Sequence, residues 1–329
     1  MDHWNANFVK YCLCAILLAL LLGCGDGFFL NYKASRPPRN DGLQFPDYPD
    51  KQNKKNISDS FVFAVIGDYG SDGKYEADVA SLINSWNPNL ILTVGDNNYP
   101  GGEDATIDAN VGKYYHKFLA NYSGNYGSGT TTMQFFPSLG NHDWDCLGCR
   151  RAPLPYLDYF SLYGNGRYYD FVRGNIHFYA LDSDPREPDG VTADSTQALW
   201  LKERLAASNS EYNIVYFHHA PFSSGNSGNT VALQWPFKEW GASCVLSGHD
   251  HHYERFDVGG LPYIVNGVGG RSLYSVHLDS KSSVFRKYID SQHFGALKSV
   301  VDSMQMVIQF YSTERVLLDQ VIIPAKAVP

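Results

Sequence analysis

Short apolar runs alternate along most of this chain with glycine-led polar turns and with segments of helical periodicity. Phe61–Ile66 and Leu90–Val94 are compact apolar runs of the length and composition typical of buried strands. Between them, Tyr75–Trp86 repeats apolar residues at the spacing of one face of a helix. This order predicts a strand–helix–strand unit, in which the two strands lie parallel in one sheet.

The rest of the chain continues this alternation. Further apolar runs predict strands at Phe135–Leu139, Ile176–Leu181, Ile214–Phe217, Cys244–Leu246 and Tyr263–Val265, and a C-terminal hairpin of Met304–Tyr311 with Arg315–Ile323. Asp194 or Ser195 is expected to cap a helix that runs to about Ala207. Together these elements predict an α/β fold in which two sheets pack face to face with helices outside.

Two segments are expected as insertions beside the carboxyl ends of the strands. Pro100–Met133 contains a predicted helix, about Ile107–Tyr122, followed by a loop rich in glycine, serine and threonine. Asp145–Gly166 contains a Cys-x-x-Cys pair and the basic pair Arg150-Arg151. Loops at the ligand end of a rigid scaffold commonly set substrate choice, although a solvated pair of arginines is the simpler interpretation of that dipeptide.

Side chains that can bind metal follow five of the apolar runs. In chain order they are Asp68, Asp96, Tyr99, Asn141, His218, His249 and His251. The carboxyl ends of parallel strands gather at one edge of a sheet, so these side chains are expected to converge there. Carboxylate and phenolate oxygens with imidazole nitrogens make a ligand set for two metal ions.

Two of these residues carry more information than the others. Two ions about 3.5–4 Å apart need a shared ligand, and the Asp96 carboxylate is the best placed to bridge them. A phenol with a pKa near 10 is a poor ligand for a divalent ion, whereas a trivalent ion lowers that pKa enough to hold phenolate. Tyr99 therefore favours Fe(III) in one position, with a divalent ion (Zn, Fe or Mn) in the other.

The motifs around these residues resemble those of a known family. They read Gly67-Asp68-Tyr69-Gly70, Gly95-Asp96-Asn97-Asn98-Tyr99, Gly140-Asn141-His142-Asp143, Val215-Tyr216-Phe217-His218 and Gly248-His249-Asp250-His251. The chain resembles the calcineurin-like metallophosphoesterases and, among them, the small purple acid phosphatases of the tartrate-resistant type. The resemblance implies a four-layer α/β/β/α sandwich of two mixed sheets. It also implies hydrolysis of phosphate monoesters by an Fe(III)–M(II) centre with a metal-activated water as nucleophile.

Two histidines next to the ligand positions are the predicted catalytic and substrate-binding residues. His142 directly follows Asn141, so its ring can face the phosphate and protonate the leaving group or stabilise the transition state. His219 directly follows His218 and is predicted to contact substrate, with a purely structural role as the alternative. Asp143 and Asp250 are expected to orient histidine ligands from outside the metal site.

Three other functions use or imitate the same scaffold. A phosphodiesterase or nucleotidase would also use two metals, but Tyr99 speaks against it because many such enzymes lack a tyrosine ligand. A protein phosphatase of the Ser/Thr class would place Asp-Arg after the second Gly-Asp, where this chain has Asn97-Asn98. A non-catalytic surface-binding module would be expected to have lost ligands, and none is missing.

Composition and charge narrow the partners. The chain has 329 residues, of which 44% are hydrophobic, enough for one large α/β domain with a substantial core. The formal net charge is −8, which makes nucleic acid an unsuitable partner. A phosphorylated small molecule is the expected substrate.

The N-terminus has the pattern of an export signal. Residues 11–22 form an uncharged apolar run that is too short for a membrane span and matches the core of a signal peptide. Leu21-Leu22-Gly23-Cys24 resembles a lipoprotein cleavage box, which predicts a signal over residues 1–24 and lipid attachment at Cys24; a conventional signal peptide is the alternative. Residues 25–59 are expected to be a flexible linker, and residues 60–329 the catalytic domain.

The remaining cysteines fit an exported protein. Cys146 and Cys149 lack the second pair that a zinc ribbon needs, so a local disulfide is expected in an extracytoplasmic protein that is lipid-anchored, periplasmic or secreted. Cys244 lies in an apolar run and is expected to be a core residue.

Overall fold

The structure is a computed structural model that describes residues 60–146, 155–302 and 304–326. The chain divides into two units, Met1–Pro37 and Pro38–Pro329, and every described residue belongs to the second. The predicted signal, Cys24, the linker, Cys149 and the Arg150-Arg151 pair lie outside the described residues. In the part that is described, no helix combines the length and apolarity needed to cross a membrane.

The first sheet is mixed and has the strand order β13-β12-β11-β1-β2-β3. Its strands are β1 (Phe61–Ile66), β2 (Leu90–Thr93), β3 (Phe135–Pro137), β11 (Gly295–Val301), β12 (Gln305–Ser312) and β13 (Leu317–Pro324). The first three pair in parallel, which confirms the strand–helix–strand unit, and β12 and β13 form the predicted antiparallel hairpin.

The second sheet is also mixed, with the order β10-β8-β9-β7-β6-β5-β4. Its strands are β4 (Tyr169–Arg173), β5 (Ile176–Ala180), β6 (Tyr212–His219), β7 (Cys244–Gly248), β8 (Tyr253–Val258), β9 (Leu261–Asn266) and β10 (Arg286–Asp290). The four central strands β5, β6, β7 and β9 are parallel to one another, while the outer strands pair antiparallel.

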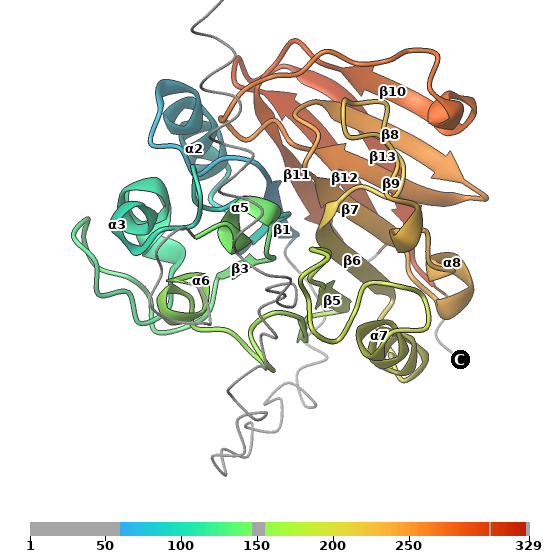
Figure 1. The fold of residues 1–329 in the computed structure, drawn as a ribbon, viewed down its shortest axis with the longest axis horizontal. Coiled ribbons are helices and arrows are strands. Elements are labelled where there is room, and N and C mark those ends of the chain that lie inside the picture. The colour runs from blue at the N-terminus through green and yellow to red at the C-terminus, as the bar shows by residue number, and fades with distance from the viewer. Residues whose placement is uncertain (1–59, 147–154, 303, 327–329) are drawn as a thin grey trace, which may run out of the picture. The chain divides into compact units, whose positions relative to one another are not determined.

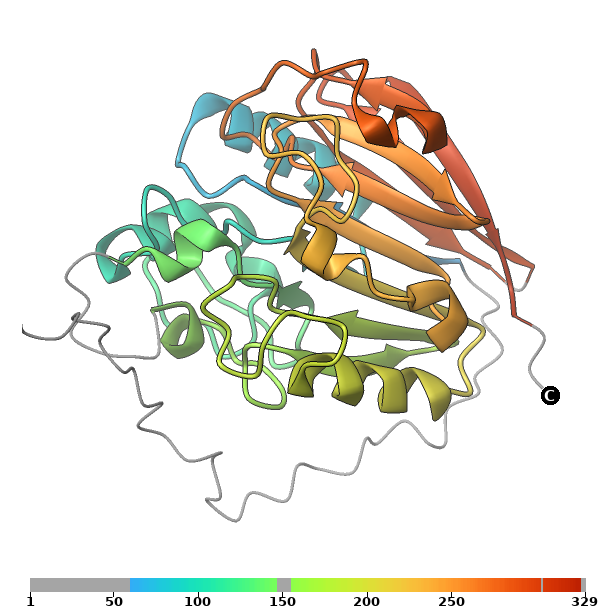
Figure 2. The ribbon, with the colours of Figure 1, turned by 45° about the vertical axis from the view of Figure 1, so that its right-hand side comes forward.

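Helices cover the outer face of each sheet (Figures 1 and 2). The α-helices are α2 (Lys74–Trp86), α3 (Asp104–Ile107), α4 (Lys113–Tyr115), α5 (Asn141–Trp144), α6 (Pro155–Tyr159), α7 (Thr196–Ala206) and α8 (Phe237–Trp240). The remaining helical turns are the π-turn η2 (Asp108–Gly112) and the 3₁₀ turns η3 (His116–Phe118), η4 (Val231–Leu233) and η5 (Lys281–Phe285).

Three apolar clusters fill the spaces between the layers of the fold. Between the sheets, Phe136 of β3 stacks on Phe171 of β4 at 3.7 Å between ring centres, within one cluster that draws on both sheets. A second cluster joins α2 and the helical segment 104–118 to the first sheet, and a third joins α7 and α8 to the second. The predicted two-sheet α/β sandwich with outer helices is confirmed.

The structure corrects one helix boundary and confirms one predicted cap. The helix expected at about residues 107–122 begins at Asp104 and ends at Phe118, with a π-turn in its middle. In that turn the Asn110 side chain donates to Asn98 Oδ1 and to the Tyr99 carbonyl, a tertiary tie that periodicity does not reveal. Helix α7 is capped by Ser195, whose hydroxyl accepts the Ala198 amide at 3.2 Å.

Candidate metal centre

Five strands, three from the first sheet and two from the second, deliver the predicted ligands to one place. Asp68 follows β1, Asp96 and Tyr99 follow β2, and Asn141 is the first residue of α5 just after β3. From the second sheet, His218 lies near the end of β6, and His249 and His251 follow β7. All seven side chains meet at the carboxyl ends of these strands, as their sequence positions predicted.

One half of the cluster, the first ligand group, consists of Asp68, Asp96, Tyr99 and His251. The Tyr99 hydroxyl lies 2.7 Å from Asp96 Oδ2, 3.4 Å from Asp68 Oδ1 and 3.3 Å from His251 Nε2. His251 Nε2 is also 3.3 Å from Asp68 Oδ1. The two carboxylates and His251 are buried and offer ligand atoms within 4.8 Å of one another.

The other half, the second ligand group, consists of Asp96, Asn141, His218 and His249. His218 Nε2 lies 3.1 Å from Asn141 Oδ1, 3.2 Å from His249 Nδ1 and 3.3 Å from Asp96 Oδ1. Asp96 thus presents one oxygen to each group. No other residue belongs to both groups.

These separations suit bound metal ions. The donor atoms of each group lie 2.7–3.4 Å from their neighbours, near enough for the atoms of one group to share one ion. His218 Nδ1 lies 2.8 Å from the carbonyl of Val94, which can only accept, so the hydrogen is on Nδ1 and Nε2 is free for an ion. His251 Nδ1 is held 2.8 Å from the Ser272 hydroxyl, leaving its Nε2 within the first group.

Three of the ligand positions have unusual backbone conformations. Asp68, Asp96 and His249 have φ values of 55°, 53° and 71°, in the left-handed region that residues with a side chain seldom adopt. Each follows a glycine at the end of a strand. Strain of this kind persists where the surrounding fold enforces it, and it gathers at functional sites.

Two of the preceding glycines are required by close approach to other ligands. A Cβ at Gly95, whose φ is +90°, would lie 2.5 Å from His218 Nδ1. A Cβ at Gly248 would lie 2.5 Å from Asp68 Oδ2. The glycine-led turns therefore let the two sheets bring their ligands into contact.

The buried charges of the cluster depend on one another. Burial favours protonation of Asp96, but the imidazoles of His218 and His142 outweigh it and hold the pKa of Asp96 far below its usual value. Burial lowers the pKa of His218, yet Asp96 and Asp68 raise it to about 10. A metal ion and a proton would compete for His218 Nε2, because the negative charges of Asp96 and Asp68 stabilise either cation there.

The phenol of Tyr99 needs a strong cation to ionise. Burial, followed by the charges of Asp96 and Asp68, raises the pKa of Tyr99 well above its usual value. The oxygen nevertheless sits among carboxylate and imidazole ligands rather than in an apolar pocket. This donor set fits an ion of high positive charge.

His142 stands at the edge of the ligand cluster. Its Nδ1 lies 2.6 Å from the Pro100 carbonyl and its Nε2 lies 4.0 Å from Asp96 Oδ2. Its ring centre is 4.4 Å from that of Tyr99. The carbonyl takes the Nδ1 hydrogen, so Nε2 faces the site, and the side chain is 35% exposed.

His219 is fixed by Ser183, which the sequence did not single out. The Ser183 hydroxyl accepts the backbone amides of His218 and His219 at 3.2 and 2.8 Å, so its own hydrogen points to His219 Nδ1 at 2.9 Å. Burial and then the charge of His218 lower the pKa of His219 to about 2. The neutral ring therefore carries its hydrogen on Nε2.

The two carboxylates expected to orient histidine ligands do something else. Asp143 accepts the amides of Gly140 at 2.8 Å and Asn97 at 3.1 Å, tying the second and third ligand turns together. Burial, then the charge of Asp96, raises the pKa of Asp143 to about 7. Asp250 accepts the Ser227 amide at 2.9 Å. Both hold backbone turns in place, and within the described part of the chain neither bonds an imidazole.

The segment Gly270–Tyr274, which follows β9, also contacts the first ligand group and was not predicted from the sequence. Ser272 bonds His251, the Tyr274 ring stacks on the His251 ring at 4.0 Å and 8°, and the Arg271 guanidinium lies 4.9 Å from the centre of the Tyr99 ring. The signal that could have found it is the Gly269-Gly270 pair, which follows an apolar strand as the ligand turns do.

Arg186 braces the opposite side of the cluster. Its guanidinium donates to the Asn141 carbonyl at 3.1 Å and pairs with Asp184 and Asp145 at 2.6 and 2.7 Å. Cys146, one residue after Asp145, is disulfide-bonded, while Cys149 lies outside the described residues, and Cys244 is a buried free thiol as expected.

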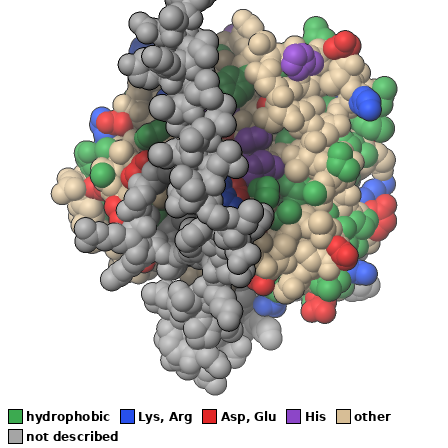
Figure 3. Space-filling model, viewed as in Figure 1, with side chains coloured by type: hydrophobic (Ala, Val, Ile, Leu, Met, Phe, Trp, Pro, Cys, Tyr) green, Lys and Arg blue, Asp and Glu red, His purple; other side chains and the backbone are tan. Residues whose placement is uncertain are grey.

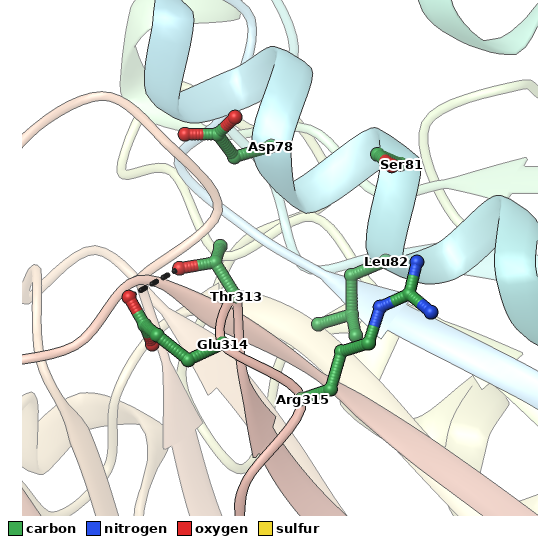
Figure 4. Close-up of a pocket in the computed structure, with 6 residues that line it drawn as sticks. All are labelled: Asp78, Ser81, Leu82, Thr313, Glu314 and Arg315. Atoms are coloured by element: carbon green, nitrogen blue, oxygen red, sulfur yellow. Dashed lines mark hydrogen bonds between the residues drawn. The ribbon is translucent and has the colours of Figure 1, made fainter.

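Two cavities share no residue with the ligand groups. One, of about 290 Å³, lies between α2 and the β12–β13 turn and is lined by Asp78, Ser81, Leu82, Thr313, Glu314 and Arg315 (Figure 4). The other, of about 760 Å³, is lined by residues that include Phe222, Trp235 and Tyr263. The chemistry is concentrated instead at the ligand cluster; histidine side chains reach the surface near the middle of the face drawn in Figure 3.

Known proteins are similar to this chain in sequence. Tartrate-resistant acid phosphatase type 5 of Rattus norvegicus is 25% identical over 243 residues, covering 63% of this chain and 72% of the relative. Purple acid phosphatase 17 of Arabidopsis thaliana is 25% identical over 269 residues, covering 71% and 76%. The human type 5 enzyme is 32% identical, but over 94 residues that cover only 29% of its length.

A solved structure agrees in fold. GAP50, the anchor in the inner membrane complex of Plasmodium, superposes with a TM-score of 0.61 and 18% identity, covering 81% of this chain and 89% of the other. At that identity the likeness shows the fold alone. The sequence profile named calcineurin-like phosphoesterase matches residues 61–253, more than half of the chain, which confirms the predicted phosphoesterase-type hydrolase. The chain therefore belongs to the calcineurin-like phosphoesterase family.

Proposed function

We propose that the protein hydrolyses phosphate monoesters with a dinuclear centre of Fe(III) and a divalent ion (Zn, Fe or Mn). The observation that carries the proposal is the position of Asp96, whose two oxygens face two separate ligand groups. Tyr99 in the first group favours Fe(III) there, because its buried phenol needs a trivalent neighbour to ionise. The relatives named as acid phosphatases support the hydrolysis of phosphate esters.

Asp96, Asp143 and the strained backbone positions each have a part in this proposed mechanism. Two bound ions supply activated water as the nucleophile and a clamp for the phosphate oxygens. Asp96 would contribute one oxygen to each ion position, and the turns tied by Asp143 keep Asp96 and Asn141 in place relative to each other. Because the Asp68, Asp96 and His249 backbones are already strained into place, little reorganisation is needed when substrate binds.

His142 is proposed as the general acid. Its Nε2 faces the site while the Pro100 carbonyl fixes Nδ1, so a proton on Nε2 can pass to the leaving oxygen of a bound ester. His219 is proposed to bind substrate. Its neutral ring, aligned by Ser183, offers the Nε2 hydrogen to a phosphate oxygen.

The experiment is phosphate release by purified protein reconstituted with iron and zinc. We expect p-nitrophenyl phosphate to be hydrolysed, and the Asp96→Asn variant to lose both ions or several orders of magnitude in turnover. The exposed carboxylate Asp279, substituted in Asp279→Asn, is the matched control and should change neither. Faster hydrolysis of bis(p-nitrophenyl) phosphate would favour the phosphodiesterase alternative. An inactive protein with two bound ions would favour a binding module.

Export and lipid attachment complete the proposal. The apolar run at residues 11–22 and the Leu22-Gly23-Cys24 sequence motivate cleavage before Cys24 and acylation of its thiol. The substrate would then be a phosphorylated small molecule met outside the cytoplasm, and the negative net charge argues against nucleic acid. Mass spectrometry of the mature N-terminus tests this. A mature end elsewhere without an acyl group would rule out the lipid anchor.

A further inference from the structure

The segment Gly270–Tyr274 carries an arginine whose charge the described residues do not neutralise. Arg271 is exposed, and its guanidinium lies 4.9 Å from the centre of the Tyr99 ring. Within residues 60–146, 155–302 and 304–326, no carboxylate lies within ion-pair distance of Arg271 and no acceptor takes a hydrogen bond from its side chain. The contact with the Tyr99 ring uses none of the five N–H groups of the Arg271 guanidinium, so with respect to the described residues all five can donate to a ligand.

The other arginine at the cluster is different. Arg186 is held by Asp184, Asp145 and the Asn141 carbonyl, so each of its three guanidinium nitrogens already donates a hydrogen bond. Among the residues that the structure describes, Arg271 is therefore the cation beside the first ligand group whose side chain makes no hydrogen bond or ion pair. Its backbone is fixed, because the Arg271 amide donates to the Asp68 carbonyl at 3.1 Å.

We propose that Arg271 binds a second anionic group on the leaving group of the substrate, and so selects phosphate esters that carry another phosphoryl or carboxylate group. This rests on the proposed function. The scissile phosphate would lie at the two ligand groups, with Asp96 between them. The Arg271 guanidinium lies over the Tyr99 ring, whose oxygen belongs to the first ligand group. From there it can contact a substituent on the far side of the scissile bond. Guanidinium binds phosphate and carboxylate through paired, charge-assisted hydrogen bonds.

The neighbouring side chains keep the fork at this position. Ser272 bonds His251 Nδ1, and the Tyr274 ring stacks on His251, so the segment is tied to the first ligand group on both sides of Leu273. The ring of Tyr99 supports the guanidinium through a cation–π contact. A substituent bound at Arg271 would therefore meet a positioned group rather than a free surface side chain.

The test compares substrates that differ by one charge. Phenyl phosphate and 3-carboxyphenyl phosphate are hydrolysed by the native protein and by Arg271→Gln. The variant should lose about tenfold or more in kcat/KM for the carboxylated ester, the order expected for charge-assisted hydrogen bonds, and less than about threefold for phenyl phosphate. Arg315→Gln, which removes an exposed arginine from the cavity of Figure 4, is the charge-matched control and should change kcat/KM for neither ester.

A binding measurement separates this inference from the proposed function. Methylphosphonate and methylenediphosphonate are titrated calorimetrically into the metal-loaded protein, and Arg271→Gln should weaken only the diphosphonate. Equal losses for both esters, or no loss for either, would overturn the selection by Arg271. If the native protein hydrolyses neither ester, the proposed function fails, while Arg271-dependent binding of the diphosphonate would still support the anion site.

Discussion

The substitution Gly95→Ala tests whether the glycine-led turns exist to let the two sheets bring their ligands together. Gly95 has φ +90°, and a Cβ there would lie 2.5 Å from His218 Nδ1 and 2.7 Å from its Cβ and Cγ. The ring would have to move, which breaks the 2.8 Å bond to the Val94 carbonyl and displaces Nε2 from Asn141 and Asp96.

The magnitude has two parts that a control can separate. An alanine at positive φ costs about 1–2 kcal/mol, and forcing an extra carbon into a packed site adds about 1–3 kcal/mol. Gly228 has φ +67° with nothing within 4 Å of a Cβ, so Gly228→Ala carries only the first part. We expect a loss in unfolding free energy of about 1–2 kcal/mol for Gly228→Ala and about 2–5 kcal/mol for Gly95→Ala.

Urea unfolding followed by tryptophan fluorescence measures the stability, and elemental analysis measures the metal. Gly95→Ala should lose the ion of the second ligand group, which contains His218, and keep that of the first. Gly228→Ala should keep both. Equal destabilisation of the two variants with full metal content in each would refute the close-approach argument.

Three further outcomes follow from the structure. His142→Ala should keep both ions and slow alkyl phosphates more than aryl phosphates, by up to about 10²–10⁴-fold; equal slowing of both classes would remove its role as an acid. Tyr99→Phe should abolish the visible charge-transfer band of the iron-loaded protein, and a band that persists would mean another ligand gives it. Burial raises the pKa of Glu76 well above its usual value, so the unfolded chain loses this proton first and stability falls as pH rises above about 4.5. Glu76→Gln should therefore gain stability relative to the native protein between pH 4 and 8, and a difference that does not change with pH, measured by thermal unfolding, would contradict this.

The convergence of the seven candidate ligands could be predicted because each of them lies next to a local signal. An apolar run followed by a glycine and a donor side chain marks a strand end, and parallel strand ends converge. The glycines before Asp68, Asp96 and His249 are needed because a Cβ at each would collide with a neighbouring side chain. The two-sheet sandwich followed from the same runs.

The supporting contacts could not be predicted, because they join residues far apart in the chain. The partners of Asp143 and His251 are Asn97 and Ser272, which only the folded sheets bring near. Strands β4, β8, β10 and β11 were missed for a related reason. Their apolar pattern is interrupted by polar side chains such as Glu254, which is buried and paired with Arg286 at 2.5 Å.

The central claim is that Asp96 joins two metal positions, and anomalous X-ray diffraction from crystals of the iron- and zinc-loaded protein tests it most directly. Data collected at the two absorption edges should place iron among Asp68, Tyr99 and His251, and zinc among Asn141, His218 and His249. The ions should lie about 3.5–4 Å apart with one Asp96 oxygen or both between them. A single ion, or two ions of which Asp96 contacts only one, would contradict the account.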